Sequence, residues 1–192
     1  MIRSFIALDL PSAVRRELRR TAEPFKRLGL DARFSAASSI HLTLKFLGDV
    51  EAERIDLLAA QIKGAASVHP PFSLRLGTLG VFPDRRRPRV LWRGLRGIAP
   101  LLELQRGISA ILAQEGFEPE KRPYAPHLTL ARLRSPRKSQ ALIEEMEAFN
   151  GAYQEDEAPV FEVGQVHLFK SVLKPSGAEY TILASASLGS TS

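Results

Sequence analysis

The feature that most constrains this chain is a tetrapeptide that occurs twice, His-Leu-Thr-Leu at residues 41–44 and again at 127–130. Around the first copy, polar residues alternate with apolar ones, namely Ile40, Leu42, Leu44 and Phe46. A period of two residues is typical of a β-strand with one buried face, because successive side chains point to opposite faces of a sheet. We therefore predict two motif strands, 39–47 and 126–133, with the leucines buried and each histidine beside its threonine on the open face.

The repetition itself carries information, because the chain has only four histidines. A random order of the same residues would place a threonine two positions after two of them roughly once in 200 shuffles. One copy alone is most simply an ordinary strand histidine with a local hydrogen bond. Two matching copies instead indicate one site that is built from two halves.

The two motifs resemble those of the 2H phosphoesterase superfamily, in the fuller forms HLTLKFLG at 41–48 and PHLTLAR at 126–132. Within that superfamily the chain most resembles the RNA 2′,3′-cyclic phosphodiesterases, which are also called 2′-5′ RNA ligases. Further similar segments are spread over nearly the whole chain: FIALDLP at 5–11, GVFP at 80–83, RPRVLW at 87–92, Ser171, and GAEY at 177–180.

Composition narrows the class of protein. A hydrophobic content of 44% in 192 residues suits one compact domain. The absence of cysteine excludes disulfide scaffolds, cysteine-ligated metals and thiol nucleophiles. The apolar stretch 5–8 is interrupted by Asp9 and Pro11 and is too short for a signal or a membrane span, so we expect a cytoplasmic protein without a membrane partner. The formal charge of +6 favours a polyanionic partner such as RNA, although a basic protein can equally gain only solubility from it.

Periodicity and turn residues predict the same order of elements in each half: strand, helix, motif strand, helix, strand. We expect Gly64 to interrupt the second helix, Asn150 and Gly151 to end the fourth, and residues 189–192 to fray. The expected strands are 2–9, 32–34, 39–47, 72–81, 89–93, 126–133, 160–169 and 179–187, and the expected helices are about 11–28, 51–63, 100–115 and 138–149.

This repeated order predicts an internal duplication within a single bilobal domain of residues 1–192. The resemblance implies the same architecture, an α+β fold with two lobes related by a pseudo-twofold axis. Each lobe would be an antiparallel sheet backed by helices. The active site would lie in the cleft between the two sheets.

The residue types suit the opening of a cyclic phosphodiester. That reaction needs a base for the attacking water and an acid for the departing sugar oxygen, on opposite sides of phosphorus. Two facing imidazoles meet this need near neutral pH, and threonine hydroxyls can donate to the non-bridging phosphate oxygens without a metal.

The resemblance implies that His41 is the proton donor to the leaving oxygen and that His127 is the proton acceptor from water, with Thr43 and Thr129 on the phosphate. It also implies hydrolysis of RNA-terminal 2′,3′-cyclic phosphate to a 2′-phosphate, without a cofactor. Because the two motifs are nearly identical, the sequence alone leaves open which histidine is the acid.

Several further residues are candidate contacts to RNA or phosphate. Lys45 shares the parity of His41 and is expected to face the cleft, unless it is a solvated lysine at a strand end. Strict alternation turns Arg132 away from His127, so either a bulge redirects it or its side chain only extends to the rim. The other candidates are Arg3 and Phe5 on the first strand and the run Arg85, Arg86 and Arg87, which is either an exposed turn or a rim that binds RNA phosphates.

Other interpretations remain beside the leading one. His69 and His167 lack the following threonine and are expected to be structural. No His-x-x-x-His pattern or cluster of carboxylates accompanies the motifs, so we predict no metal.

The expected partners are RNAs with 2′,3′-cyclic phosphate ends, tRNA fragments among them, or cyclic nucleotides, bound by a monomer. The alternatives are joining of tRNA halves through a 2′-5′ bond, or binding of RNA ends without catalysis. ATP-driven ligation is not expected, because the chain has no glycine-rich phosphate loop.

Overall fold

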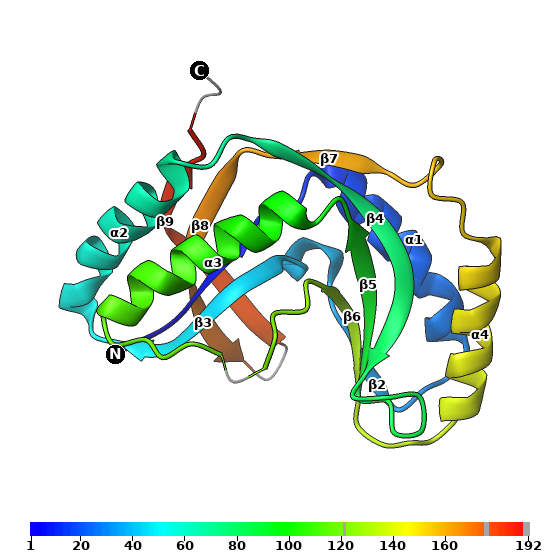
Figure 1. Ribbon diagram of the computed structural model, residues 1–192. Helices are drawn as coiled ribbons and strands as arrows, with labels where there is room; N and C mark the ends of the chain where they lie inside the picture. Colours follow the sequence, from blue (N-terminus) through cyan, green and yellow to red (C-terminus); the bar gives the residue numbers. More distant parts are fainter. Residues whose placement is uncertain (121, 175–176, 190–192) are drawn as a thin grey trace.

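The computed structural model describes residues 1–120, 122–174 and 177–189. Over these ranges the chain forms nine strands in two antiparallel sheets, together with four α-helices. The sheets and their helices lie side by side as two lobes (Figure 1). The predicted α+β class with two helix-backed antiparallel sheets is therefore confirmed.

The first lobe contains a four-stranded sheet. Helices α2 (Ile55–Ser67) and α3 (Ala99–Gln114) pack against each other and against this sheet. Short 3₁₀ turns precede β3 and α2, at Ala37–Ser39 and Ala52–Arg54. The strand order is β3-β1-β8-β9, with bounds β1 Ile2–Leu8, β3 Leu42–Val50, β8 Gln165–Lys174 and β9 Gly177–Ser187.

The second lobe contains a five-stranded sheet. Helices α1 (Ser12–Arg27) and α4 (Ser139–Ala152) contact each other, and α4 packs on β4 (Figure 1). The strand order is β2-β6-β5-β4-β7, with bounds β2 Ala32–Phe34, β4 Phe72–Phe82, β5 Val90–Arg96, β6 Leu128–Leu133 and β7 Val160–Val163.

Each lobe combines elements from both halves of the chain. In the first half, β1, β3 and α2 belong to the first lobe, whereas α1 and β4 belong to the second. In the second half the assignment is reversed, because β5, β6 and α4 belong to the second lobe and α3 and β8 to the first. The two halves thus follow one path with the lobes interchanged, which is the arrangement that a duplicated unit would produce.

Both motif strands start later than predicted and β3 and β5 end later, and three further differences have a clear structural cause. Helix α2 continues through Gly64 to Ser67, because the face formed by its buried apolar residues still packs on the lobe. Helix α4 continues through Asn150 and Gly151, because the Asn150 amide bonds to β4 instead of ending the helix, accepting from Leu79 N at 2.7 Å and donating to Leu79 O at 2.9 Å. The predicted strand 160–169 is divided into β7 and β8, which lie in different sheets.

The core runs without a break from one lobe to the other. The four motif leucines belong to it, and Leu42, Leu44, Leu128 and Leu130 are between 0% and 2% exposed. Burial of one leucine side chain stabilises a fold by about 2 kcal/mol, so the motif strands are held from behind. None of the described helices is long and apolar enough to cross a bilayer. Of the tail predicted to fray, residues 190–192 lie outside the described residues.

Candidate active site

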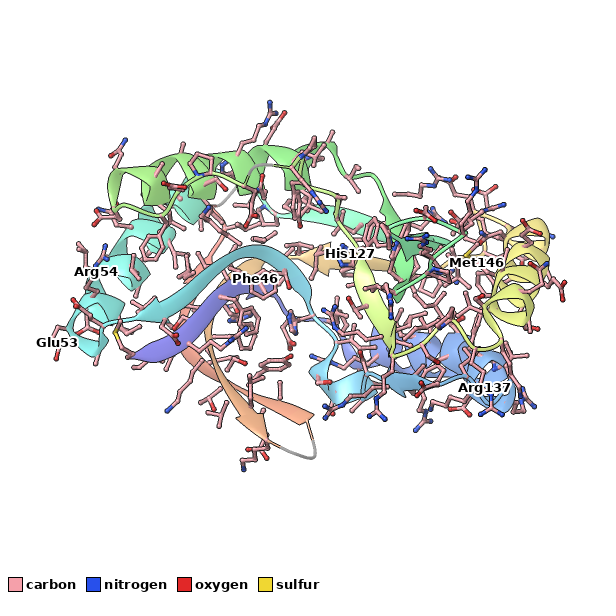
Figure 2. All side chains as sticks on the ribbon, turned by 90° about the horizontal axis from the view of Figure 1, so that it is seen from below. Phe46, Glu53, Arg54, His127, Arg137 and Met146 are labelled. Atoms are coloured by element: carbon pink, nitrogen blue, oxygen red, sulfur yellow. The ribbon has the colours of Figure 1, made fainter. Side chains whose placement is uncertain are left out.

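Both motif histidines lie immediately before their strands rather than within them. β3 begins at Leu42 and β6 at Leu128, later than the predicted starts at 39 and 126. His41, Thr43, His127 and Thr129 all line one cavity of about 490 Å³. In Figure 2, Phe46 of β3 and His127 lie near the middle of the molecule, where segments of the two lobes approach each other.

The two imidazole rings are oriented by the same local contact. His41 Nδ1 is 2.9 Å from the carbonyl of Ser39, and His127 Nδ1 is 2.8 Å from the carbonyl of Ala125. A carbonyl only accepts hydrogen bonds, so each Nδ1 carries the hydrogen and donates it. The proton-exchanging nitrogen of each ring is therefore Nε2.

A β-bulge at the same point of each motif changes which side chains face the cavity. Next to β1, the pairing moves from Lys45 directly to Thr43, so Leu44 has no partner. Next to β5, the pairing moves from Ala131 directly to Thr129, so Leu130 has none. An extra residue in one strand shifts the alternation by one position. Two consecutive side chains are therefore buried in each strand, and the alternation resumes in the opposite phase.

The bulge explains why strict alternation failed for Phe46 and Arg132. Phe46, which strict alternation places on the same face as the buried leucines, is 61% exposed and lines the cavity. Arg132 lines the same cavity instead of pointing away from His127, as the bulge alternative required. The two residues occupy equivalent positions after the two motifs, one on each lobe.

Lys45 does not face the cleft, so that expectation was wrong. The bulge at Leu44 turns its side chain to the buried face, where it is only 2% exposed. Its Nζ donates to the Glu118 carbonyl at 2.7 Å. Lys45 thereby ties β3 to the segment that leads to the second motif. Tyr124 strengthens this tie, because its Oη donates to the Thr43 carbonyl at 2.8 Å.

The remaining candidates divide into two groups. Arg3 and Phe5 line the cavity, as do Ser35 and Ser171. The arginine run lies in the β4–β5 hairpin, and the described lining of the cavity includes none of Arg85, Arg86 and Arg87. Arg85 pairs with Glu147 at 2.6 Å, and Arg85 and Arg86 border a separate, more open hollow of about 660 Å³.

Aromatic rings surround both histidines. The His41 ring lies 4.6 Å from Phe5 and 4.9 Å from Tyr180, measured between ring centroids. The His127 ring lies 5.0 Å from Phe82 and 6.4 Å from Trp92. The sequence interpretation assigned no site role to Phe46, Phe82, Trp92 or Tyr180, since an isolated aromatic residue in a strand pattern is most simply a core residue.

Burial and charge shift both histidines in the same direction. Burial lowers the pKa of His41 and of His127, and the hydrogen bond from each Nδ1 to its carbonyl partly opposes this. For His41, Arg15 lowers the pKa further and Asp9 raises it. For His127, Arg132 lowers it. In the free protein both rings therefore tend to be neutral near pH 7.

The other two histidines lie outside the described lining of the cavity. His167 is buried on β8 and its Nδ1 lies 2.8 Å from Ser185 Oγ. The His69 carbonyl accepts a hydrogen bond from Gly189 N at 2.9 Å. Within the described ranges, no three His, Cys, Asp or Glu residues are grouped so that they could hold a metal ion. The metal-free reaction itself stays a prediction.

Comparisons with known proteins identify the family of the chain. Residues 10–174 match the model of the 2′-5′ RNA ligase superfamily. An RNA 2′,3′-cyclic phosphodiesterase of Methanothermobacter thermautotrophicus is 32% identical over 94% of this chain and 95% of its own length. A second, from Thermotoga maritima, is 29% identical over 95% and 93%.

Solved structures are similar over the whole fold. A Thermus thermophilus protein superposes with a TM-score of 0.78 at 27% identity, covering 100% of both chains. Escherichia coli LigT complexed with 3′-AMP superposes with a TM-score of 0.73 at 27% identity, covering 97% of this chain and 98% of that one.

Proposed function

Because the chain belongs to the 2′-5′ RNA ligase superfamily, we propose that it is an RNA 2′,3′-cyclic phosphodiesterase. Relatives that are 32% and 30% identical over most of the chain carry that name. The observation that carries the proposal is the pair of histidines that line one cavity from different lobes, each with Nδ1 bound to the carbonyl two residues before it. This arrangement offers two Nε2 atoms for one phosphate.

In the proposed reaction, His127 Nε2 takes a proton from water while the water oxygen forms a bond to phosphorus. The bond from phosphorus to the 3′-oxygen breaks, and His41 Nε2–H gives its proton to that oxygen. The product has a 2′-phosphate and a free 3′-hydroxyl. The hydroxyls of Thr43 and Thr129 donate to the non-bridging oxygens, where negative charge develops. His127 then returns its proton to solvent and His41 regains one.

The proposed substrate is the end of an RNA strand. Arg3 and Arg132 line the cavity and can neutralise phosphate charge, and the exposed face of Phe46 can stack on a base. Arg85, Arg86 and Arg87 are proposed as a rim for phosphates farther along the strand. No metal is required, because histidines and hydroxyls supply every group that the reaction uses.

The decisive experiment incubates the purified protein, with EDTA, with an oligonucleotide that ends in a 2′,3′-cyclic phosphate. ³¹P NMR of the product is expected to show a 2′-phosphate. A 3′-phosphate would contradict the assigned leaving oxygen, and loss of activity that zinc or manganese restores would contradict the metal-free mechanism. Tight binding without turnover would instead make the protein an RNA-end-binding module. Adding an oligonucleotide with a free 5′-hydroxyl tests for 2′-5′ joining in the same reaction.

A further inference from the structure

Arg15, in the first turn of α1, binds five oxygen atoms close to the first motif. Its Nε donates to the Leu10 carbonyl at 2.9 Å, and its Nη2 donates to the Asp9 carboxylate. Its Nη1 reaches three further carbonyls, at 2.8, 2.7 and 3.0 Å, which belong to Ala37, Ser38 and Ile40. One side chain therefore joins the end of β1 to the segment that leads into the motif.

The three carbonyls bound by Nη1 surround the one that orients the histidine. Segment 37–40 ends directly before His41. The one carbonyl of this segment that Arg15 does not bind, that of Ser39, accepts the hydrogen bond from His41 Nδ1. The planar guanidinium fixes the neighbouring peptide units, since its N–H groups have set directions. The position of the Ser39 carbonyl, and with it the ring orientation of His41, therefore depends on Arg15.

The second motif reaches the same ring geometry by a different route. The lead-in 123–126 has a proline at each end, which stiffens the backbone, and Tyr124 fastens it to Thr43. Among the described residues, no arginine side chain donates to a carbonyl of that lead-in. Each histidine thus donates from Nδ1 to the carbonyl two residues before it, but the charged groups beside the two rings differ.

We propose that Arg15 and Asp9 are positioning residues for His41, in which Arg15 fixes the peptide segment whose carbonyl orients the ring and Asp9, by accepting from Nη2, holds the Arg15 guanidinium in place. The inference rests on the proposed function, because it concerns the orientation of the histidine that the proposal makes the proton donor. It adds two residues that lie outside the described lining of the cavity.

The charges around His41 act in opposite directions. Burial lowers its pKa most and the hydrogen bond to Ser39 opposes this, whereas Arg15 lowers the pKa further and Asp9 raises it by a smaller amount. The rings packed on His41 come from Phe5, Phe169 and Tyr180, and Arg3 and Arg132 line the same cavity. The charged neighbour that acts on His127 is Arg132, which lowers its pKa. Of the two motif histidines, His41 alone has a described carboxylate that favours its charged form.

The test is an NMR titration of the histidines in the free protein, which does not depend on any activity. Asp9→Asn keeps the side-chain shape and should lower the pKa of His41, whereas Arg15→Gln should raise it. His167 serves as an internal control, because Asp9 raises its pKa whereas Arg15 does not contribute to its shift. Asp9→Asn should therefore lower both pKa values, and Arg15→Gln should move His41 only. The proposal would be overturned if the two variants shifted the pKa of His41 in the same direction, if His127 shifted as much as His41, or if the pKa of His41 did not change.

Kinetics then separate charge from geometry. Arg15→Lys keeps the charge but loses the planar fork, and kcat should fall about 10- to 100-fold with little change in KM. The matched control is Arg16→Lys, because within the described part of the chain the only hydrogen bond of the Arg16 side chain is a 3.4 Å contact to Ser12 Oγ, and this variant should keep kcat. In the pH profile of kcat/KM, Asp9→Asn should move the basic limb to lower pH.

Wild-type kcat in Arg15→Lys would refute the positioning role. A variant of Arg15 that fails to fold would leave the decision to Asp9→Asn, which alone must show the lowered pKa at His41 and His167. If the protein hydrolyses no cyclic phosphate, the NMR titration still tests whether Arg15 and Asp9 act on His41, because it uses the free protein. Failure of this inference is therefore distinguishable from failure of the proposed function.

Discussion

At the scale of single residues, the two histidines must hold one proton between them although burial lowers the pKa of each. A phosphodiester brings a negative charge into the cavity, and a nearby anion favours an imidazolium. Substrate binding would therefore help to charge the donor. In the free protein, by contrast, the singly protonated pair is most populated between the two lowered pKa values.

The first prediction follows from the lowered pKa values of both histidines in the free protein. The profile of kcat/KM against pH, which reports the free enzyme, should be bell-shaped with its maximum below the ordinary histidine pKa of about 6.5. The profile of kcat, which reports the complex, should lie at higher pH, because the bound phosphate raises the pKa of the donor. Steady-state rates across the histidine range measure both. A kcat/KM maximum well above that pKa would contradict the pair.

The second prediction separates the roles of the histidines. His41→Ala and His127→Ala should each lower kcat about 10²- to 10⁴-fold. In the residual activity, His41→Ala should lose the basic limb of the pH profile and His127→Ala the acidic limb. Thr43→Ala and Thr129→Ala should cost less, since each removes one donor among several. His69→Gln, outside the described lining of the cavity, is the control and should keep full activity. If His41→Ala instead lost the acidic limb and His127→Ala the basic limb, the assignment of proton donor and acceptor would be reversed.

At the scale of elements, the site depends on how β3 is joined to the segment before β6. β3 is the outer strand of its sheet, and it is joined to residues of that segment by two hydrogen bonds, from Tyr124 Oη to the Thr43 carbonyl and from Lys45 Nζ to the Glu118 carbonyl. Both bonds connect the first motif strand to residues that precede the second motif.

The third prediction uses two tyrosines with the same kind of bond. Tyr124 and Tyr153 each donate Oη to a strand carbonyl at 2.8 Å, but only Tyr124 binds a motif residue. Tyr124→Phe and Tyr153→Phe should each lower the free energy of unfolding by about 1 kcal/mol, measured in urea. Only Tyr124→Phe should also lower kcat, because the Thr43 carbonyl loses its anchor. Equal kinetic effects in both variants would contradict a specific role of the hydrogen bond from Tyr124 to Thr43 in catalysis.

At the scale of the whole molecule, neither lobe can form from one half of the chain. The first sheet needs β8 from the second half, and the second sheet needs β4 from the first. We therefore propose that residues 1–192 form one bilobal domain that arose by duplication.

The fourth prediction is a single unfolding transition in urea, coincident by far-ultraviolet circular dichroism and by tryptophan fluorescence, since the core is shared. Two separated transitions would show that the lobes are independent.

The fifth prediction concerns the arginines of the β4–β5 hairpin, which the described lining of the cavity does not include. Replacing Arg85, Arg86 and Arg87 by alanine should raise KM for an oligonucleotide and flatten its salt dependence, because fewer counterions are released on binding. Hydrolysis of a cyclic mononucleotide should barely change, since it has no neighbouring phosphate. Loss of the exposed Arg85–Glu147 pair should cost little stability.

The control for the hairpin removes the same charge from α1, by replacing Arg16, Arg19 and Arg20. That variant should leave KM for the oligonucleotide nearly unchanged. Equal effects on both substrates would assign the hairpin arginines to the reaction centre or to stability. No effect on either would make the run a solvated turn.

Local periodicity and the repeated motif were enough to predict the order of the elements, the burial of the motif leucines and the pairing of the two His-x-Thr motifs, and the family resemblance implied the α+β class. Strict alternation predicted the wrong orientation for Lys45, Phe46 and Arg132. That orientation depends on the unpaired residues Leu44 and Leu130, and a bulge exists only relative to the neighbouring strand.

Tertiary structure also decided that Asn150 bonds to β4 instead of ending its helix, and that Arg15 binds segment 37–40. These contacts join residues far apart in the chain, whose partners no local pattern reveals. The exchange of elements between the lobes has the same origin, because a hydrophobic face shows that an element is buried but not against which sheet.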